Sequence, residues 1–365
     1  MDERIKMMLL LNCINAGSSS LAKYLTSGAS PSDLWAPGKA DFAQSIFGEK
    51  RILALRKANA EAWAEREYER AYKLGVTILS IEDEAYPAVL TELKDAPLIL
   101  YVRGSAEILH KKQRTGVVGT RRMSRYGKGT ARSIGEICAK YMMPLISGGA
   151  WGVDSEAQRA CCENGGDTAA VLGTGVDISY PPANAALFET ITARGALISE
   201  FPLGSSGAPW HFPQRNRIIA ALSEKLIVVE APMKSGSMIT ARTALELGRE
   251  IWAVPGQIDS PNSEGTNRLI YDGAFPYISD EVFLSSCGIS VPQNASLQAA
   301  FPDGLSPEDR KILTVLSKNK DMTIDNLSIS VKMGAADLLK NIALLSSKGL
   351  VFMSAPGRYS TKCKE

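Results

Sequence analysis

The stretch HFPQRNRIIAALS (His211–Ser223) is followed after one glutamate by KLIVVEA (Lys225–Ala231). The first stretch reads as a helix whose apolar run enters a core, and the second as a short buried strand. The same alternation of short β-branched runs with helical patterns extends from Val76 to about Phe283. Apolar strands that alternate with helices predict an α/β fold, with a parallel sheet covered on both faces and ligands bound beyond the carboxyl ends of its strands.

The length, net charge and cysteine content of the sequence limit the classes of protein to consider. With 365 residues and a formal net charge of +2, the chain is long enough for two or three domains, and any basic site must be local. Six scattered cysteines and the two histidines, His110 and His211, form no zinc-binding pattern and are typical of a reduced protein. No stretch reads as a signal peptide or a membrane span. We therefore expect a cytoplasmic protein with no metal and no membrane partner.

Four regions are predicted along the chain. Residues 1–75 read as a helical domain, similar to small SAM or helix-hairpin-helix modules, and residues 76–283 as the α/β domain. Residues 284–303 lack periodicity and predict a linker. Residues 304–365 contain three helical segments and a hairpin, which is typical of a winged helix-turn-helix domain.

The end of the first parallel strand carries the strongest concentration of positive charge. The run from Lys111 to Lys128 holds seven basic residues and no acid, inside a nearly neutral chain. Gly119 allows a close turn of the backbone, and the N–H groups of the helix that follows form an anion site. The alternative is a solvated basic helix face. The residues that would hold the anion are Gly119, Thr120, Arg121, Arg122 and Arg125.

Two further strand ends repeat this pattern. The second strand ends in Ser147-Gly148-Gly149, which offers small residues and backbone donors, and KSGSMITAR (Lys234–Arg242) follows the KLIVVEA strand. The latter reads either as an oxyanion cradle or as an ordinary helix capped by a serine. Several cradles in a row suit a polymeric phosphate backbone better than one nucleotide. The cradle residues are Ser147, Gly148, Gly149, Lys234, Ser235, Gly236 and Ser237.

The sequence lacks the patterns of the common nucleotide-dependent enzymes. It has no G-x-G-x-x-G, and no acid follows the second strand to hold a ribose, which argues against NAD. GKGT (Gly127–Thr130) lacks the hydroxyl residue and glycine spacing of a Walker A loop. His211 stands beside no nucleophile and reads as structural. We therefore expect no catalytic residues and no cofactor.

Taken together, the motifs resemble those of the DNA-processing protein A family (DprA, also called Smf). GVVGTRRMSRYG, LISGGAWGVDSEAQRA, FPQRNRIIAALS and VVEAPMKSGSMITAR occur here in the order found in that family, and the likeness covers about Tyr86 to Ala274. The resemblance implies an extended Rossmann-like domain that binds single-stranded DNA without sequence preference. It also implies a non-enzymatic homodimer that protects incoming DNA and loads the RecA recombinase during natural transformation and homologous recombination.

The resemblance also assigns roles to individual residues. Arg215 and Arg217 would either hold phosphates or brace the loop that does, and Asn216 would cap the helix beginning IIAALS or fix the arginine geometry. Trp151 stands where the family usually has arginine, so that its ring either stacks on a base or packs against the loop. The resemblance places these residues at the DNA: Gly119, Thr120, Arg121, Arg122, Ser147, Gly148, Gly149, Phe212, Arg215, Asn216, Arg217, Ser235, Gly236 and Ser237.

Two other functions use the same strand-end pocket. SGGAWGVDSE (Ser147–Glu156) partly resembles the loop of nucleotide phosphoribohydrolases, which would make the chain an enzyme. A small-nucleotide sensor that gates the terminal domain is the other alternative. The expected recognition helix of that domain, Gly334–Lys348, carries no arginine, so we expect little sequence-specific binding of duplex DNA. Contact with protein, or weak contact with DNA near Arg358, is expected instead.

Overall fold

A computed structural model describes residues 2–28, 30–34, 40–57, 59–290, 304–319 and 321–361. The chain divides into two compact units, Met1–Phe283 and Leu284–Glu365, which are described separately. Most of the predicted linker, from residue 291 onward, falls outside the described residues. Within the described ranges, no helix is long and apolar enough to cross a membrane.

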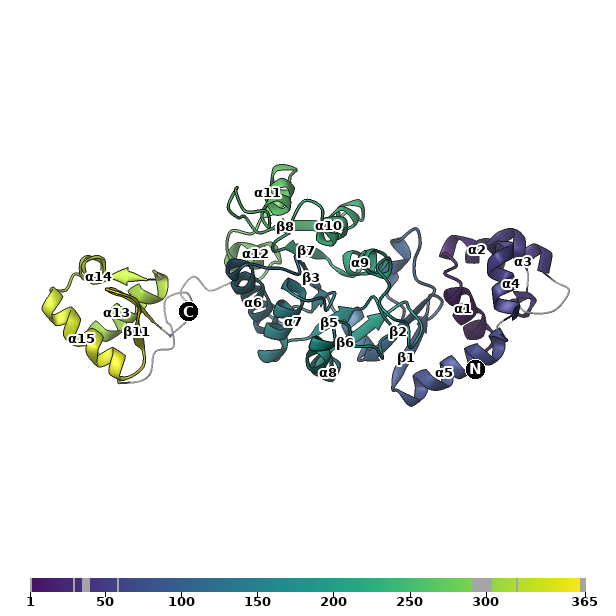
Figure 1. The fold of residues 1–365 in the computed structure, drawn as a ribbon, viewed down its shortest axis with the longest axis horizontal. Coiled ribbons are helices and arrows are strands. Elements are labelled where there is room, and N and C mark those ends of the chain that lie inside the picture. The colour runs from purple at the N-terminus through teal and green to yellow at the C-terminus, as the bar shows by residue number, and fades with distance from the viewer. Residues whose placement is uncertain are drawn as a thin grey trace. The chain divides into compact units, whose positions relative to one another are not determined.

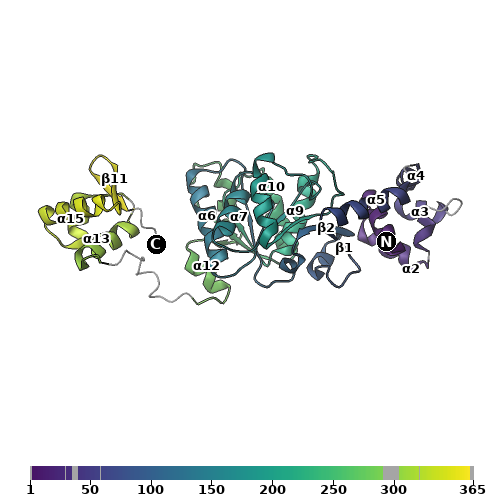
Figure 2. The same cartoon turned by 90° about the horizontal axis from the view of Figure 1, so that it is seen from below.

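The first unit begins with a group of α-helices that packs into the same core as the sheet. Helix α1 buries five consecutive apolar residues, Met7 to Leu11, and they share a hydrophobic cluster with Ile99 and Tyr101 of the sheet. Helix α5 leads from this group to the edge of the sheet (Figure 1 and Figure 2). The bounds are α1 Glu3–Cys13, α2 Ser18–Thr26, α3 Ala40–Phe47, α4 Glu49–Lys57 and α5 Ala60–Lys73, with a short 3-10 turn at Pro31–Leu34.

A nine-stranded sheet forms the centre of the first unit, in the order β1-β2-β6-β5-β4-β3-β7-β8-β9. The pairs β1–β2 and β2–β6 are antiparallel, and all the other pairs are parallel. The predicted α/β class is therefore confirmed. The bounds are β1 Val76–Ser80, β2 Ile99–Gly104, β3 Thr115–Val118, β4 Leu145–Ser147, β5 Thr168–Val171, β6 Ala196–Ser199, β7 Lys225–Val228, β8 Glu250–Ala253 and β9 Phe275–Pro276.

Helices cover both faces of this sheet (Figure 1). The strands that follow β3 are added first on the β4 side and then on the β7 side, so that the strand order reverses at β3. Such a reversal leaves a crevice beyond the strand ends, where open α/β sheets bind ligands. The helix bounds are α6 Arg125–Lys140, α7 Val153–Glu163, α8 Ala185–Arg194, α9 His211–Leu222, α10 Gly236–Glu246, α11 Glu264–Tyr271 and α12 Asp280–Ser286, with 3-10 turns at Ala88–Glu92, Ala106–Leu109 and Pro182–Asn184.

The second unit contains the predicted helices and hairpin. Its first helix starts at Pro307 because Ser306 accepts a hydrogen bond from the backbone N–H of Asp309, the cap that the sequence indicates. A three-stranded antiparallel sheet in the order β10-β12-β11 completes the unit. Its assignment as a winged helix stays a prediction. The bounds are α13 Pro307–Lys318, β10 Met322–Thr323, α14 Ile324–Val331, α15 Ala335–Ser347, β11 Val351–Ala355 and β12 Arg358–Thr361.

Candidate nucleic-acid interface at the strand ends

A pocket of about 640 Å³ opens beyond the carboxyl ends of β3 and β7, next to the reversal of strand order. Three segments that the sequence singled out converge on it: the loop after β3, the first turns of α9 and the start of α10. The predicted residues that line the pocket are Gly119, Thr120, Arg121, Arg122, Phe212, Arg215, Asn216, Lys234, Ser235, Gly236 and Ser237. Within the described part of the chain, the predicted residues outside this lining are Arg125, Ser147, Gly148, Gly149 and Arg217.

The loop after β3 presents positive charge that no carboxylate among the described residues neutralises. Arg121 and Arg122 are exposed, and in the described ranges neither forms an ion pair. The guanidinium carbon of Arg121 lies 5.2 Å from the ring centroid of Phe212, so the ring supports its position. By contrast, Lys128 and Arg132, farther along α6, both pair with Glu156. In the described ranges, the unpaired charge therefore lies at the strand end and in the first turn of α6, where Arg125 is exposed and forms no ion pair.

A buried carboxylate, Glu230, holds this loop in place. Glu230 lies two residues beyond the end of β7, is 2 % exposed, and accepts hydrogen bonds from the backbone N–H of Ser124 at 2.8 Å and from its hydroxyl at 2.5 Å. The carbonyl of Glu230 accepts the N–H of Thr120 at 2.7 Å. No role was predicted for Glu230, although an acid just beyond a buried strand signals a polar contact at a strand end.

Arg215 is a brace inside the protein. Its side chain is buried at 4 % exposure and donates hydrogen bonds through Nη1 to the carbonyls of Gly148, at 2.5 Å, and Val171. Burial lowers the pKa of Arg215 to about 10, although the nearby carboxylate of Asp154 opposes this shift. Burial also raises the pKa of Asp154, against the opposing effect of Arg215. Arg215 therefore satisfies backbone carbonyls that belong to two different strand ends.

Asn216 fixes the arginine and does not cap a helix. Helix α9 begins at His211, seven residues before Ile218, so the predicted start at IIAALS is wrong. Pro213 does not prevent the earlier start, because a helix tolerates proline in its first turn, where the N–H groups have no intrahelical partner. The side-chain oxygen of Asn216 accepts a hydrogen bond from Nε of Arg215 at 3.1 Å, and its amide nitrogen donates to the carbonyl of Gly236 at 3.3 Å.

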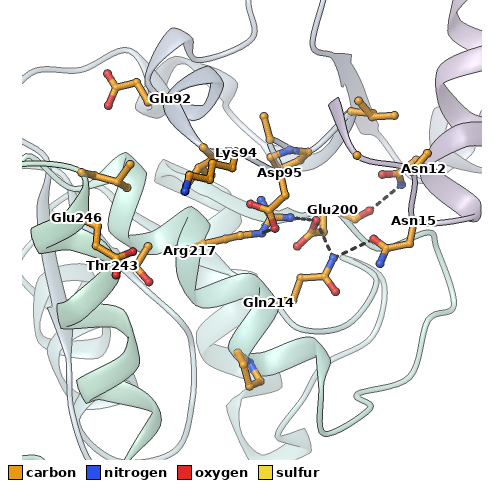
Figure 3. A pocket seen from close by; sticks show the side chains of 18 residues that line it. Asn12, Asn15, Glu92, Lys94, Asp95, Glu200, Gln214, Arg217, Thr243 and Glu246 are labelled. Carbon is orange, nitrogen blue, oxygen red and sulfur yellow. Dashed lines mark hydrogen bonds and ion pairs between the residues drawn. The ribbon is translucent and has the colours of Figure 1, made fainter. Parts of the chain in front are cut away.

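Arg217 lies on the opposite face of α9 from the strand-end pocket. It pairs with Glu200 and, at 3.2 Å, with Asp95, and it lines a different pocket together with Gln214 (Figure 3). Burial raises the pKa of Glu200 to about 7, although Arg217 opposes the shift. The two arginines of the F-P-x-R-N-R motif are therefore both internal, and neither presents a free cation to the strand-end pocket.

The predicted second cradle is closed by protein side chains. Ser147 is fully buried, and its hydroxyl donates to the carbonyl of Val117 at 2.6 Å. A Cβ on Gly148 would lie 2.7 Å from the guanidinium of Arg215, and one on Gly149 would lie 2.7 Å from the ring of Phe188. This segment therefore needs small residues to pack, a reason that differs from the predicted contact with an anion.

The start of α10 remains an open anion cradle. Ser235 occupies the N-cap position, but its side chain makes no capping hydrogen bond. Its hydroxyl oxygen is buried and finds no hydrogen-bond partner in the described residues. The alternative of an ordinary serine cap at Ser235 is therefore wrong, and the first N–H groups of the helix keep their capacity to bind an anion. Lys234, which is exposed and lines the pocket, adds a positive charge.

Aromatic rings form the remaining wall of the strand-end pocket. Tyr180 and Phe212 both line it, with ring centroids 5.4 Å apart. Trp151 is 56 % exposed and follows the lining residue Ala150, so its ring does not pack into the core. His211 is buried, and its Nδ1 lies 3.0 Å from the carbonyl of Gly173, in agreement with the structural role expected for it. No cluster of three or more potential metal ligands occurs in the described ranges.

The arrangement of motifs around this pocket has counterparts in known proteins. Residues 77–287 match the family described as DNA recombination-mediator protein A, which is more than half of the chain. The chain belongs to this family. The resemblance drawn from the sequence motifs is thereby confirmed.

Curated relatives of this family member carry the names Smf and DprA. Protein Smf of Synechocystis sp. is 38 % identical over 239 residues, which are 64 % of this chain and 58 % of that protein. DNA processing protein DprA of Streptococcus pneumoniae is 42 % identical over 197 residues, 53 % of this chain and 68 % of that one. DprA of Bacillus subtilis is 36 % identical over 257 residues, 67 % and 86 % of the two chains. The chain thus spans less than two thirds of the Synechocystis protein.

Solved structures of the same family share the fold. DNA processing protein A of Streptococcus pneumoniae superposes with a TM-score of 0.64 at 30 % identity, over 80 % of this chain and 99 % of that one. DNA processing protein A of Helicobacter pylori, solved to describe its single-stranded DNA binding mode, gives a TM-score of 0.53 at 29 % identity, over 58 % and 95 % of the two chains.

Proposed function

We propose that this chain binds single-stranded DNA without sequence preference, at the pocket beyond β3 and β7. The observation that carries the proposal is the presence of positive charge and aromatic rings in one pocket. Arg121, Arg122 and Lys234 form no ion pair in the described ranges and lie beside the uncapped start of α10, and Tyr180 and Phe212 line the same pocket, with the guanidinium of Arg121 over the ring of Phe212. Charged groups neutralise phosphates and aromatic rings stack any base, so this combination suits a single strand and reads no sequence.

The cellular role proposed for the chain follows from its family. Relatives named as DNA processing proteins, and a family described as a DNA recombination mediator, support a function in handling incoming DNA during natural transformation and homologous recombination. We include in the proposal the protection of that DNA, the loading of RecA recombinase onto it, a homodimeric state and a cytoplasmic location. Light scattering of the purified chain measures the dimer, and strand-exchange assays on protein-coated DNA measure the loading.

We also propose that the chain is not an enzyme. The phosphoribohydrolase alternative needs free carboxylates in the segment Ser147–Glu156. Asp154 instead accepts the N–H of Gly148 at 3.1 Å beside Arg215, and Glu156 pairs with Lys128 and Arg132. Because both acids are engaged, neither is placed to act on a sugar. Release of free base from nucleoside monophosphates by the purified chain would contradict this part of the proposal.

The first experiment is fluorescence anisotropy with a labelled poly-dT oligonucleotide and a duplex of equal length, across salt concentrations. We expect tighter binding of the single strand, with a log–log salt slope that falls by about 0.7 for each phosphate contact removed. Arg121→Ala is expected to lower both affinity and slope. No binding of the oligonucleotide at low salt, or a preference for the duplex, would overturn the proposal.

The size of the pocket favours a second candidate, a small-nucleotide sensor. A volume of about 640 Å³ falls in the range of small-ligand sites, on the order of 300–1,000 Å³. A mononucleotide that binds the folded chain raises its melting temperature by mass action. A thermal shift produced by mononucleotides, and not by oligonucleotides of the same base, would favour the sensor over the DNA-binding protein.

A further inference from the structure

Two loops support the aromatic wall of the strand-end pocket. Tyr180 belongs to the loop after β5, residues 172–181, and Phe212 lies in the first turn of α9, which follows the loop after β6, residues 200–210. Gly207 and Pro209 of the second loop also line the pocket. Because the ring centroids of Tyr180 and Phe212 lie 5.4 Å apart, the position of one loop against the other sets the spacing of the rings.

Hydrogen bonds join the two loops to each other. Gly175 of the loop after β5 donates its N–H to the carbonyl of Ser205 in the loop after β6, at 3.0 Å. Asp177 adds a side-chain contact, because its Oδ1 accepts the N–H of Gly204 at 2.8 Å. A Cβ on Gly175 would lie 2.6 Å from that carboxylate oxygen and 2.7 Å from the carbonyl oxygen of Pro202. The loops therefore meet too closely at this point to admit a side chain.

The ring of Phe212 packs on both loops. A Cβ on Gly173, in the loop after β5, would lie 2.8 Å from this ring, and a Cβ on Gly207, in the loop after β6, would lie 3.1 Å from it. A shift of either loop therefore moves the ring or opens a gap beside it. The basic loop after β3 has a separate support, since the carbonyl of Glu230 accepts the N–H of Thr120.

Helix α5, in the N-terminal group of helices, contacts the joined loops through two polar side chains. Oδ2 of Asp177 accepts a hydrogen bond from Arg70 at 2.6 Å, and the side chain of Asp177 is 11 % exposed. One turn earlier on α5, the carboxylate of Glu67, a buried residue, accepts the N–H of Leu203 at 2.7 Å. Two consecutive N–H groups of the loop after β6, those of Leu203 and Gly204, are thus held by acids. A hydrogen bond to an ionised carboxylate is about twice as strong as a neutral one, which makes Asp177 a firm anchor.

We propose that Asp177 is a positioning residue for base stacking in the strand-end pocket. By holding the loop after β6 against the loop after β5, it keeps the rings of Tyr180 and Phe212 at their spacing. Within the described ranges, Asp177 lies outside the lining of the pocket, so it acts through the rings and not on the DNA itself. The inference rests on the proposed DNA binding and divides it in two: the basic loop holds phosphates, and the joined loops hold the surface on which bases stack.

Fluorescence anisotropy of the full chain tests this role with two labelled probes, poly-dT and an oligonucleotide of equal length whose sugars carry no bases. Asp177→Ala should weaken binding of poly-dT about five- to twentyfold at every salt concentration, with an unchanged log–log salt slope, because stacking is lost and the phosphate contacts are kept. Binding of the abasic probe should be unchanged. The loss of a negative charge would by itself strengthen DNA binding, so a change in electrostatics does not produce the expected result.

Three further variants separate the position of the rings from general damage to the fold. Asp177→Asn keeps an oxygen for the N–H of Gly204 and should bind poly-dT within about twofold of the natural chain. Gly175→Ala leaves every charge in place, forces the loops apart and should repeat the pattern of Asp177→Ala, so it carries the test if that variant does not fold. Asp167→Ala removes an acid that pairs with Lys111 at 2.6 Å, in neither loop, and should change the binding of neither probe.

The outcomes distinguish this inference from the DNA binding on which it rests. Natural affinity for poly-dT in both Asp177→Ala and Gly175→Ala would overturn the positioning role, and so would an equal loss on the two probes, which would indicate general damage to the site. A natural chain that binds both probes with the same affinity would exclude base stacking and overturn the inference while leaving phosphate binding in place. A natural chain that binds neither probe would overturn the proposed DNA binding itself.

Discussion

Gly127 shows how one missing side chain shapes the basic loop. It lies in the first turn of α6, and a Cβ there would lie 2.4 Å from a carboxylate oxygen of Glu230. That carboxylate is the group that holds Ser124, and the backbone of Glu230 holds Thr120. The geometry of the loop after β3 therefore depends on a glycine that the sequence offered only as part of an incomplete Walker pattern.

Substitution of this glycine is the first prediction. Gly127→Ala should lower the free energy of unfolding by about 1–3 kcal/mol, because the new methyl displaces a buried carboxylate. Gly129→Ala is the matched control, since nothing lies within 4 Å of its Cβ, and alanine there should raise stability by up to about 1 kcal/mol. Urea unfolding measures both. Equal effects of the two substitutions would contradict the role of Glu230.

Glu200 gives the second prediction, a dependence of stability on pH. Its pKa of about 7 in the folded chain exceeds the ordinary value of 4.5, because burial disfavours its charged form. Between these values the folded chain holds a proton that the unfolded chain has released. Stability therefore falls as pH rises through this window, by at most about 1.4 kcal/mol per pH unit from this group.

The variant Glu200→Gln should flatten that part of the stability profile. Denaturant unfolding at pH 5, 6 and 7 measures the slope for the variant and for the natural sequence. Glu246→Gln, in the same pocket but exposed, should keep the natural slope. A profile for Glu200→Gln that parallels the natural one would show that other groups carry the dependence.

At the scale of the element, the buried arginine of helix α9 and the exposed arginine of the loop after β3 have different roles, one in stability and the other in binding. Arg215 is enclosed by backbone carbonyls and Asp154, whereas Arg121 is exposed at the pocket. Arg215→Ala should cost about 3–5 kcal/mol of stability, because it leaves the carbonyls of Gly148 and Val171 without their donor and removes the positive charge near the buried Asp154. Arg121→Ala should change stability by less than about 0.5 kcal/mol and act on DNA affinity instead. Thermal and denaturant unfolding of both variants, beside anisotropy, separate the two roles.

The helix starts provide a further prediction at this scale. Ser124 caps α6 by accepting the N–H of Gly127 at 3.0 Å, whereas Ser235 makes no cap on α10. Ser124→Ala should therefore cost about 1 kcal/mol or more, and Ser235→Ala should leave stability nearly unchanged. If Ser235→Ala destabilises the chain as much as Ser124→Ala, the hydroxyl of Ser235 has a structural partner and the cradle is not free for an anion.

The elements divide into those that sequence patterns predict and those that they do not. The short apolar runs that form β3 to β8 are recognisable in the sequence because strands buried on both faces are continuously apolar. The edge strand β1 carries a weaker pattern, because exposed and buried residues are mixed along it, whereas β2 lies inside the sheet and is a continuous apolar run from Ile99 to Val102. The sequence offers no means of distinguishing Arg121, which is exposed and forms no ion pair in the described ranges, from Arg215 and Arg217, whose side chains are internal. That distinction depends on carbonyls and carboxylates brought from distant strands.

At the scale of the whole molecule, the N-terminal helices and the sheet share one core. Met7 to Leu11 of α1 pack in the same cluster as Tyr101 and Leu197 of the sheet. Residues 1–283 should therefore unfold in a single cooperative transition, and residues 76–283 alone should be markedly less stable because they expose that face. Calorimetry of the two fragments measures this. Two separate transitions in residues 1–283 would show that the helices fold independently.

Helix α9 forms a wall between two pockets, and Pro213 lines both of them. An occupant that favours one position of the helix over another changes the free energy of that position for every other ligand of the wall. By thermodynamic linkage the effect is reciprocal: the factor by which a ligand on one face alters the affinity for DNA on the other equals the factor by which DNA alters the affinity for that ligand. A single coupling free energy then describes how the two faces of α9 affect one another.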